Sequence, residues 1–174
     1  MKAQNAKNRW VKLFTVMTLI FALTAAFTGC KKETPTQQSS NTGNETVKTE
    51  VTGGSDLKIQ KSELSNTVKF YGYKSGDTYM EVLAVKAKDG SIKTAFNTCQ
   101  VCYSSGKGYY KQKGDTVVCQ NCGNVFDIAY IGKARNGCNP VPVEPSAIKD
   151  DGSSIVVSKD FLDSSKNLFL KWKK

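Results

Sequence analysis

Two Cys-x-x-Cys pairs constrain this chain more than any other feature of its sequence. Cys99 and Cys102 form the first pair, Cys119 and Cys122 form the second, and 16 residues separate the two pairs. A tight turn over two intervening residues brings both sulfurs of a pair to one side of the backbone, where N–H groups stabilise thiolates. This spacing is a recognised metal-site pattern, and four thiolates in a tetrahedron suit Zn²⁺ or iron. We therefore expect both pairs to contribute to one metal centre.

The two turns are not equivalent. Gly123 follows the second pair, where such a turn often needs a permissive φ angle. Tyr103 occupies the matching place after the first pair. The loop between the pairs contains Gly106, Gly108 and Gly114, which give it the freedom to bring the pairs together.

Cys138 is a fifth thiol of the same region, in the run Gly137-Cys138-Asn139-Pro140-Val141-Pro142. The rigid loop expected there fits an extra or alternative ligand, a redox-active neighbour, or a buried free thiol. Disulfides are the alternative to metal, because small exported domains often contain them. Five cysteines cannot all pair within one chain, however, and a disulfide across two residues stabilises little. We favour metal for this reason.

The absence of histidine excludes several classes of site. A Ser-His-Asp triad, a Cys-His nucleophile pair and a His-ligated zinc hydrolase all require it. We identify no catalytic residue, and we expect a binding protein or electron carrier rather than an enzyme. The net charge of +10 falls to +6 without the leader described below. The scattered lysines, with no basic stripe of interleaved aromatics, argue against nucleic acid as a partner.

Residues 1–29 are expected to be a lipoprotein signal peptide. An apolar run over 13–27 is too short for a comfortable membrane span. It ends in Phe27-Thr28-Gly29-Cys30, which resembles a bacterial lipobox with Cys30 as the residue that receives palmitate or a similar acyl chain. An uncleaved anchor is the alternative, and both place the domain on the extracytoplasmic face of the cell membrane. The basic residues before the run are Lys2, Lys7, Arg9 and Lys12.

After Cys30, the segment up to residue 56 is rich in Ser, Thr, Asn, Gln and Gly and is expected to be a flexible tether. From 57 to 174 short apolar runs alternate with turn signals, which indicates a single, mostly β domain of short antiparallel strands. Asp89-Gly90 predicts a hairpin with a two-residue turn, and a short helix is expected from Ser158 with Leu162 facing inward. The expected strands are 68–73, 79–86, 92–96, 116–118, 155–157 and a last one centred on 168–170, and 125–131 is a further apolar segment.

The residues around the cysteines resemble the FtrD-like family of membrane iron–sulfur-containing proteins. The resemblance spans roughly 57–171 and is densest over 96–143. Asn97 and Asn136 stand where the family often has Asp and Gly. The matching stretches are Ala95-Phe96-Asn97-Thr98-Cys99-Gln100-Val101-Cys102-Tyr103, Gly108-Tyr109, Gly114-Asp115-Thr116-Val117-Val118-Cys119-Gln120-Asn121-Cys122-Gly123, Phe126, Ile131-Gly132 and Gly137-Cys138-Asn139-Pro140-Val141-Pro142.

The resemblance implies an iron–sulfur or iron cofactor, a link to iron uptake, and membrane iron-transport or redox proteins as partners. It makes Cys99, Cys102, Cys119, Cys122 and Cys138 the ligand candidates. The leader, with Lys7-Asn8-Arg9 rather than a twin arginine, indicates general secretion of an unfolded chain. A cluster assembled in the cytoplasm would not survive that passage, whereas a single zinc or iron ion could bind outside.

Three functions follow from these observations. The first is electron transfer or iron handling at the membrane by a cysteine-ligated centre. The second is a binding module in which zinc only stabilises the fold. The third is a thiol–disulfide oxidoreductase, although the Trp-Cys-x-x-Cys context of thioredoxin-like proteins is missing.

Overall fold

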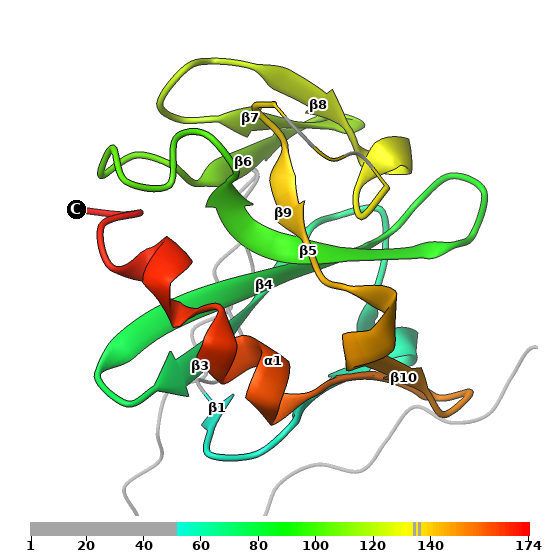
Figure 1. The fold of residues 1–174 in the computed structure, drawn as a ribbon. Helices are drawn as coiled ribbons and strands as arrows, with labels where there is room; N and C mark the ends of the chain where they lie inside the picture. Colours follow the sequence, from blue (N-terminus) through cyan, green and yellow to red (C-terminus); the bar gives the residue numbers. More distant parts are fainter. Residues whose placement is uncertain (1–51, 134, 136) are drawn as a thin grey trace, which may run out of the picture. The chain divides into compact units, whose positions relative to one another are not determined.

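The computed structural model describes residues 52–133, 135 and 137–174 (Figure 1). The expected leader, the lipidation site Cys30 and the expected tether up to residue 51 lie outside these ranges. Within them, no helix has the length and hydropathy of a membrane span.

The described residues are mostly β-strand, as the sequence predicts. A central sheet has the order β1-β3-β4-β5-β9, and two smaller sheets have the orders β10-β11-β2 and β6-β7-β8. The strands pair antiparallel except β1 with β3. The strands are β1 (Thr52–Gly53), β2 (Leu57–Gln60), β3 (Lys69–Ser75), β4 (Thr78–Lys86), β5 (Ile92–Cys99), β6 (Tyr110–Lys113), β7 (Thr116–Cys119), β8 (Val125–Asp127), β9 (Pro140–Pro142), β10 (Ile148–Asp150) and β11 (Ser154–Val157). The helical elements are η1 (Lys61–Glu63), η2 (Ile128–Tyr130), η3 (Pro145–Ala147), α1 (Lys159–Ser164) and η4 (Lys166–Phe169).

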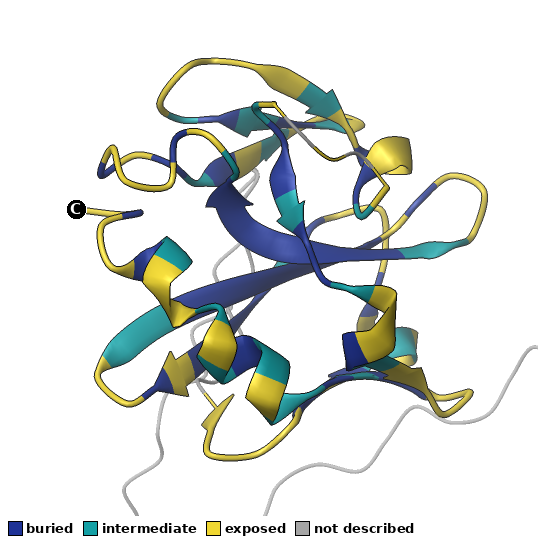
Figure 2. Ribbon diagram, in the orientation of Figure 1, coloured by how far each residue is buried: buried dark blue, intermediate teal, exposed yellow. Residues whose placement is uncertain are grey.

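The two central strands, β4 and β5, are buried on both faces (Figure 2). Because side chains alternate across a strand, each strand contributes to two separate cores. Met80, Val82 and Phe96 belong to the first core, together with residues of β2, β11, α1 and η4. Leu83 and Cys99 belong to the second core, with residues of β6 and β7. The central sheet therefore lies between two layers, and the thiols lie in the second.

The hairpin between β4 and β5 differs in detail from the prediction. The N–H of Ala87 donates to the carbonyl of Ser91, and the N–H of Gly90 donates to that of Ala87. The connection is therefore a three-residue loop, Lys88 to Gly90, rather than a two-residue turn. Gly90 has a φ of 80°, which fits a type I turn followed by a left-handed glycine.

The last predicted strand, centred on 168–170, is wrong. The Ser158 side chain caps α1 as expected by accepting from the N–H of Phe161, and Leu162 is fully buried. Ser165 then keeps right-handed helical angles, so the chain continues into η4 instead of extending. Phe169 points inward, where it packs edge-on against Phe96, whereas Leu170 is 62% exposed.

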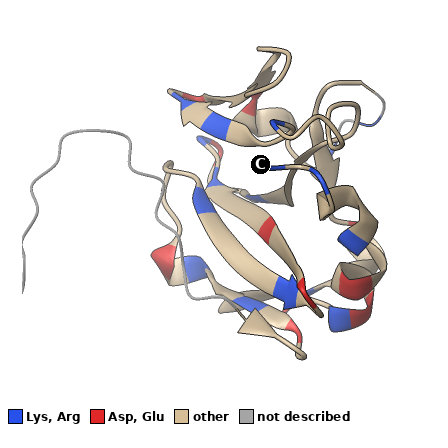
Figure 3. Ribbon diagram, turned by 90° about the vertical axis from the view of Figure 1, so that its left-hand side faces the viewer, with Lys and Arg blue, Asp and Glu red and all other residues tan. Residues whose placement is uncertain are grey.

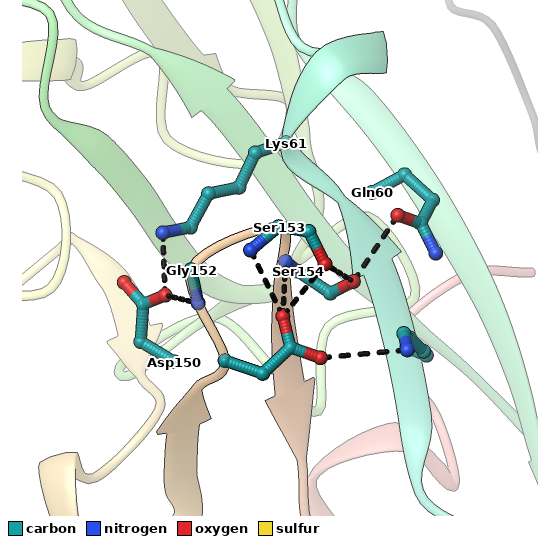
Figure 4. A network of polar contacts seen from close by, with 8 residues as sticks. Gln60, Lys61, Asp150, Gly152, Ser153 and Ser154 are labelled. Atoms are coloured by element: carbon teal, nitrogen blue, oxygen red, sulfur yellow. Dashed lines mark hydrogen bonds and ion pairs between the residues drawn. The ribbon is translucent and has the colours of Figure 1, made fainter.

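The turn between β10 and β11 is built by two aspartates (Figure 4). Asp151 accepts hydrogen bonds from the backbone N–H groups of Ser153 and Ser154, and it pairs with Lys58 at 3.4 Å. Asp150 accepts from the N–H of Gly152 and pairs with Lys61. These contacts attach the β10–β11 hairpin to β2 and its C-terminal end.

The helical form of η4 predicts unequal effects of two neighbouring substitutions. Phe169→Ala removes a buried ring and is expected to lower the free energy of unfolding by about 3–5 kcal/mol. Leu170→Ala is expected to change it by less than about 0.5 kcal/mol. Urea unfolding of the full-length protein followed by circular dichroism measures both. Equal losses, or a larger loss at Leu170, would contradict the helical assignment.

Asp163 predicts a pH dependence of stability, because it links α1 to β3. Its carboxylate pairs with Lys159 and accepts a hydrogen bond from the Tyr73 hydroxyl at 3.1 Å. The Lys159 contact, followed by hydrogen bonds from Ser75 and Tyr73, lowers the pKa of Asp163 to about 2 from 3.8. The stabilisation is thus complete above pH 3.8 and is lost as the pH falls towards 2. Asp163→Asn should unfold at lower urea than wild type at pH 7, and the difference should shrink below about pH 4. A difference independent of pH would contradict this.

Candidate metal centre

Four of the five described thiols converge at one point. The sulfurs of Cys99, Cys102, Cys119 and Cys138 all lie within 4.8 Å of one another. Cys138 Sγ lies 3.2 Å from Cys99 Sγ and 3.7 Å from Cys102 Sγ. None of the five described cysteines forms a disulfide. Three of the four thiols of the two Cys-x-x-Cys pairs therefore meet, Cys138 joins them, and Cys122 lies outside this group.

The first pair follows directly from β5. Cys99 is the last residue of that strand and is fully buried, and the N–H of Cys102 donates to Cys99 Sγ at 3.3 Å. The N–H of Cys99 itself donates to the carbonyl of Gly108. A Cβ on Gly108 would lie 2.2 Å from the Cys102 carbonyl oxygen, so only glycine fits there. The chain after the first pair folds back closely onto it.

The second pair follows β7 in the same way. Cys119 ends the strand with 1% exposure, and the N–H of Gly123 donates to its carbonyl at 2.9 Å. Gly123 has a φ of 73°, as the sequence predicts for a glycine after such a turn. Cys122 lies at the solvent side of this turn and is exposed. One thiol of the second pair is thus buried and the other faces water.

Cys138 reaches the other sulfurs because β9 pairs with β5. Pro140 is the register partner of Cys99, which brings the residues before β9 beside the end of β5. The N–H of Gln100 donates to the carbonyl of Asn139, and the side chain of Asn124 donates to the carbonyl of Cys138. Backbone contacts to both Cys-x-x-Cys turns therefore hold this loop.

The thiols differ in how readily they ionise. Burial raises the pKa of Cys102 and Cys138, and it raises that of Cys119 to about 12. Burial also opposes ionisation of Cys99, but the nearby Tyr110 hydroxyl and the hydrogen bond from the Cys102 N–H bring its pKa below the ordinary value. A hydrogen bond from Cys138, then one from the Asn124 N–H, lowers the pKa of Cys122 to about 7. Several thiolates in this space require a positive charge between them.

Tyr110 is a buried polar neighbour of the thiols. Its hydroxyl forms no hydrogen bond of ordinary length with any described residue, and it faces the sulfur of Cys99. Burial and the charge of the Cys99 thiolate together raise the pKa of this hydroxyl. The hydroxyl is therefore available to donate to a metal-bound thiolate.

A buried polar link holds the backbone of Tyr110. Its N–H donates to the Asn97 side chain at 2.8 Å, and the Asn97 amide donates to Glu81 at 2.7 Å. Glu81 is 1% exposed and also accepts from the Tyr79 hydroxyl at 3.0 Å, with Lys173 at 3.6 Å. This link connects the thiol site to the surface of the C-terminal segment.

The C-terminal segment adds positive charge beside the first pair. The N–H groups of Gly106 and Gly108 donate to the carbonyls of Lys171 and Trp172, so this segment lies along the loop that follows Cys102. Figure 3 shows Lys and Arg residues, in blue, next to the C-terminus. Lys107, Lys171 and Lys174 are exposed and form no ion pair with a described residue. The positive charge of this segment favours a centre in which the thiolates carry more negative charge than a bound metal ion neutralises.

The site fits one tetrahedral metal ion. All donors are sulfur, and thiolates bonded at about 2.3 Å to one ion would lie roughly 3.8 Å apart. The observed separations of 3.2 and 3.7 Å, and the 4.8 Å limit for the set, bracket that value. An iron–sulfur cluster would place several irons and sulfides between the thiolates, which requires wider spacing. Cys99, Cys102, Cys119 and Cys138 are the residues that would hold the ion.

Sequence reasoning missed the residues that support the thiols. Tyr71, Tyr73 and Tyr110 are buried, and Tyr109 is half-buried against the first core. The particular place of Tyr110 beside Cys99 depends on the β6–β7 pairing, in which it is the partner of Cys119. Asn97 and Glu81 carry no local signal. Alternating burial along β4 and β5 would have placed both on the same face as Cys99.

Comparison with known proteins places the chain in a family. The sequence model of a family described as membrane iron-sulfur containing protein FtrD-like matches residues 64–169, which is more than half of the chain. No curated protein sequence matches the chain. One solved structure that matches is a crystal structure of the quaternary ammonium Rieske monooxygenase CntA with an inhibitor, at 18% identity and a TM-score of 0.38. The match covers 62% of this chain and 32% of that chain. A TM-score this low supports no argument about fold or function.

The polar link to Tyr110 predicts a stability effect. Asn97→Ala leaves the buried carboxylate of Glu81 and the N–H of Tyr110 each without its amide partner. It is expected to lower the free energy of unfolding by about 1–3 kcal/mol for each group left unpaired. The exposed Asn167→Ala is the control and should change stability by less than about 0.5 kcal/mol. Urea unfolding measures both, and a loss no larger than the control's would rule the link out as structural.

Proposed function

The chain belongs to the FtrD-like family of membrane iron-sulfur containing proteins, and we propose that it holds iron at the thiol cluster. In this proposal Cys30 carries the lipid anchor, and the domain works on the extracytoplasmic face of the cell membrane. There it transfers electrons or handles iron for uptake, with membrane iron-transport or redox proteins as partners. The convergence of the sulfurs of Cys99, Cys102, Cys119 and Cys138 is the observation that carries the proposal.

The spacing of the sulfurs favours a single iron ion over a cluster. The separations of 3.2 and 3.7 Å suit thiolates around one ion, as argued above. A general secretion signal supports the same conclusion, because a single ion can bind after the chain has crossed the membrane unfolded. Thiolate-bound iron supplies one-electron oxidation and reduction.

The chain's own residues set the conditions of that chemistry. The ends of β5 and β7 fix the sulfurs of Cys99 and Cys119, and the loop before β9 contributes the sulfur of Cys138. Burial of these sulfurs excludes water from the centre, while the Cys102 N–H and the Tyr110 hydroxyl face Cys99 Sγ. Hydrogen bonds to sulfur and solvent exposure both tune the reduction potential of such centres.

A structural zinc site is the second candidate, because the sulfur spacing suits Zn²⁺ equally well. In that case the metal would stabilise the junction between β5 and the β6-β7-β8 sheet, and an exposed surface would carry the function. A thiol–disulfide oxidoreductase has less support, because four of the five thiols lie at the junction of packed elements rather than on one exposed turn.

Metal content and colour test the proposal. The full-length protein, purified without oxygen in detergent, should contain one iron per chain and show visible absorbance that bleaches reversibly on reduction. The Cys99→Ser variant should lose most of both. One zinc per chain and no colour would instead support the structural site. An absence of metal, with two disulfides, would refute both candidates.

Tyr110→Phe tests the hydrogen bond to the centre. The variant should keep its iron, but its reduction potential should fall by on the order of tens of millivolts, because a donor to the Cys99 thiolate is lost. Tyr71→Phe is a matched control, since its hydroxyl is also buried without a partner but lies in the first core. Direct electrochemistry measures both. Equal potentials for Tyr110→Phe and wild type would show that this hydroxyl does not tune the centre.

A further inference from the structure

The number of thiols exceeds the number of positions around a tetrahedral ion. Five of the described cysteines are free thiols, yet the group within 4.8 Å contains only Cys99, Cys102, Cys119 and Cys138. We propose that Cys122 is the exchange ligand of the centre: it replaces Cys138 transiently, so that metal is loaded and released through the exposed side of the second turn. This inference rests on the proposed function, because it requires a metal at the thiol cluster.

The position of Cys122 suits this role. It shares its turn with Cys119, a buried ligand candidate three residues earlier in the chain. Its thiol is within interaction distance of the Cys138, Cys119 and Cys102 thiols. It is the one exposed thiol among the five described cysteines, whereas Cys99, Cys102 and Cys119 are buried. A ligand from outside can therefore reach the centre on the side of Cys122 before it can reach any other sulfur.

Cys138 is the ligand that can be displaced most easily. Cys99 and Cys119 end β5 and β7, and Cys102 is fixed to Cys99 by its own N–H group at 3.3 Å. Removing any of these sulfurs would disturb a strand or the first turn. Cys138 lies in a loop before β9 and is half-buried. Its sulfur can turn away from the centre without breaking a strand pairing.

The exchange conserves charge and electrons. As Cys122 Sγ binds, its proton passes to solvent, and Cys138 Sγ takes up a proton from solvent as it leaves. Three thiolates remain bound throughout, and no group is oxidised or reduced. A receiving thiolate or chelator can then compete for the exposed position held by Cys122, which lowers the barrier to transfer. Without Cys122, release requires the loss of a sulfur from the buried side.

Cobalt release from the full-length protein tests the proposal. The protein and its variants are loaded with Co²⁺ without oxygen, and EDTA is added while the thiolate-to-cobalt charge-transfer absorbance is followed. Cys122→Ser should bind one Co²⁺ with the charge-transfer intensity of wild type, but should release it about tenfold more slowly or slower still. Ala129→Ser is the control, since it introduces serine at an exposed position away from the thiols. It should release Co²⁺ within about twofold of the wild-type rate.

A second variant tests the other half of the exchange, the departure of the Cys138 sulfur. Cys138→Ser should keep the charge-transfer intensity of four thiolates, because Cys122 takes the vacated position, and should release Co²⁺ faster than wild type. The proposal is overturned if Cys122→Ser releases Co²⁺ at the wild-type rate. It is also overturned if Cys122→Ser loses the intensity of one thiolate, which would make Cys122 a resident ligand. In both cases the proposed metal site would stand. Failure of wild type itself to bind Co²⁺ would refute the site and the exchange together.

Discussion

Mutual repulsion of buried thiolates is the constraint on which this structure depends. Cys99 and Cys119 end strands of two sheets that share no strand pairing, and their sulfurs meet in the second core. As neutral thiols they pack as small apolar groups. As thiolates in a dry site they repel one another, and burial raises the pKa of Cys102, Cys119 and Cys138. A bound cation would remove this conflict, so we expect metal binding to be coupled to attachment of the β6-β7-β8 sheet.

The residues around the thiols are arranged for an anionic centre. Backbone N–H groups and the Tyr110 hydroxyl face the sulfur of Cys99, and exposed lysines of the C-terminal segment lie beside the first turn. Among the described residues, no carboxylate belongs to the group of converging sulfurs, and Glu81 is linked to that group through Asn97 and the backbone of Tyr110. This distribution of charge stabilises thiolates without competing with them for a cation.

Much of this arrangement could be read from local sequence patterns, and the remainder depends on long-range pairing. Gly123 after the second pair and Ser158 before α1 are local signals, and both are confirmed. The Cys-x-x-Cys spacing is also a local signal, and it brings together Cys99, Cys102 and Cys119 but not Cys122. The approach of Cys138 was left open, because it depends on pairing between β5 and a β9 strand that contains two prolines. A proline within a candidate run is ordinarily evidence that the run is not a strand. The run around Phe169 was predicted to be a strand because a short apolar run is compatible with a strand and with a helix. Its helical form depends on the preceding helix and on Phe96, which are invisible in the run itself.

We propose that four cysteine sulfurs surround one metal ion. X-ray absorption at the iron edge of the full-length, iron-loaded protein measures the ligands directly. We predict a first shell of four sulfurs at about 2.3 Å and no second shell from a neighbouring iron. A clear iron–iron shell would show a cluster and contradict the single-ion centre. A first shell dominated by oxygen or nitrogen would contradict the assignment of the thiols as ligands.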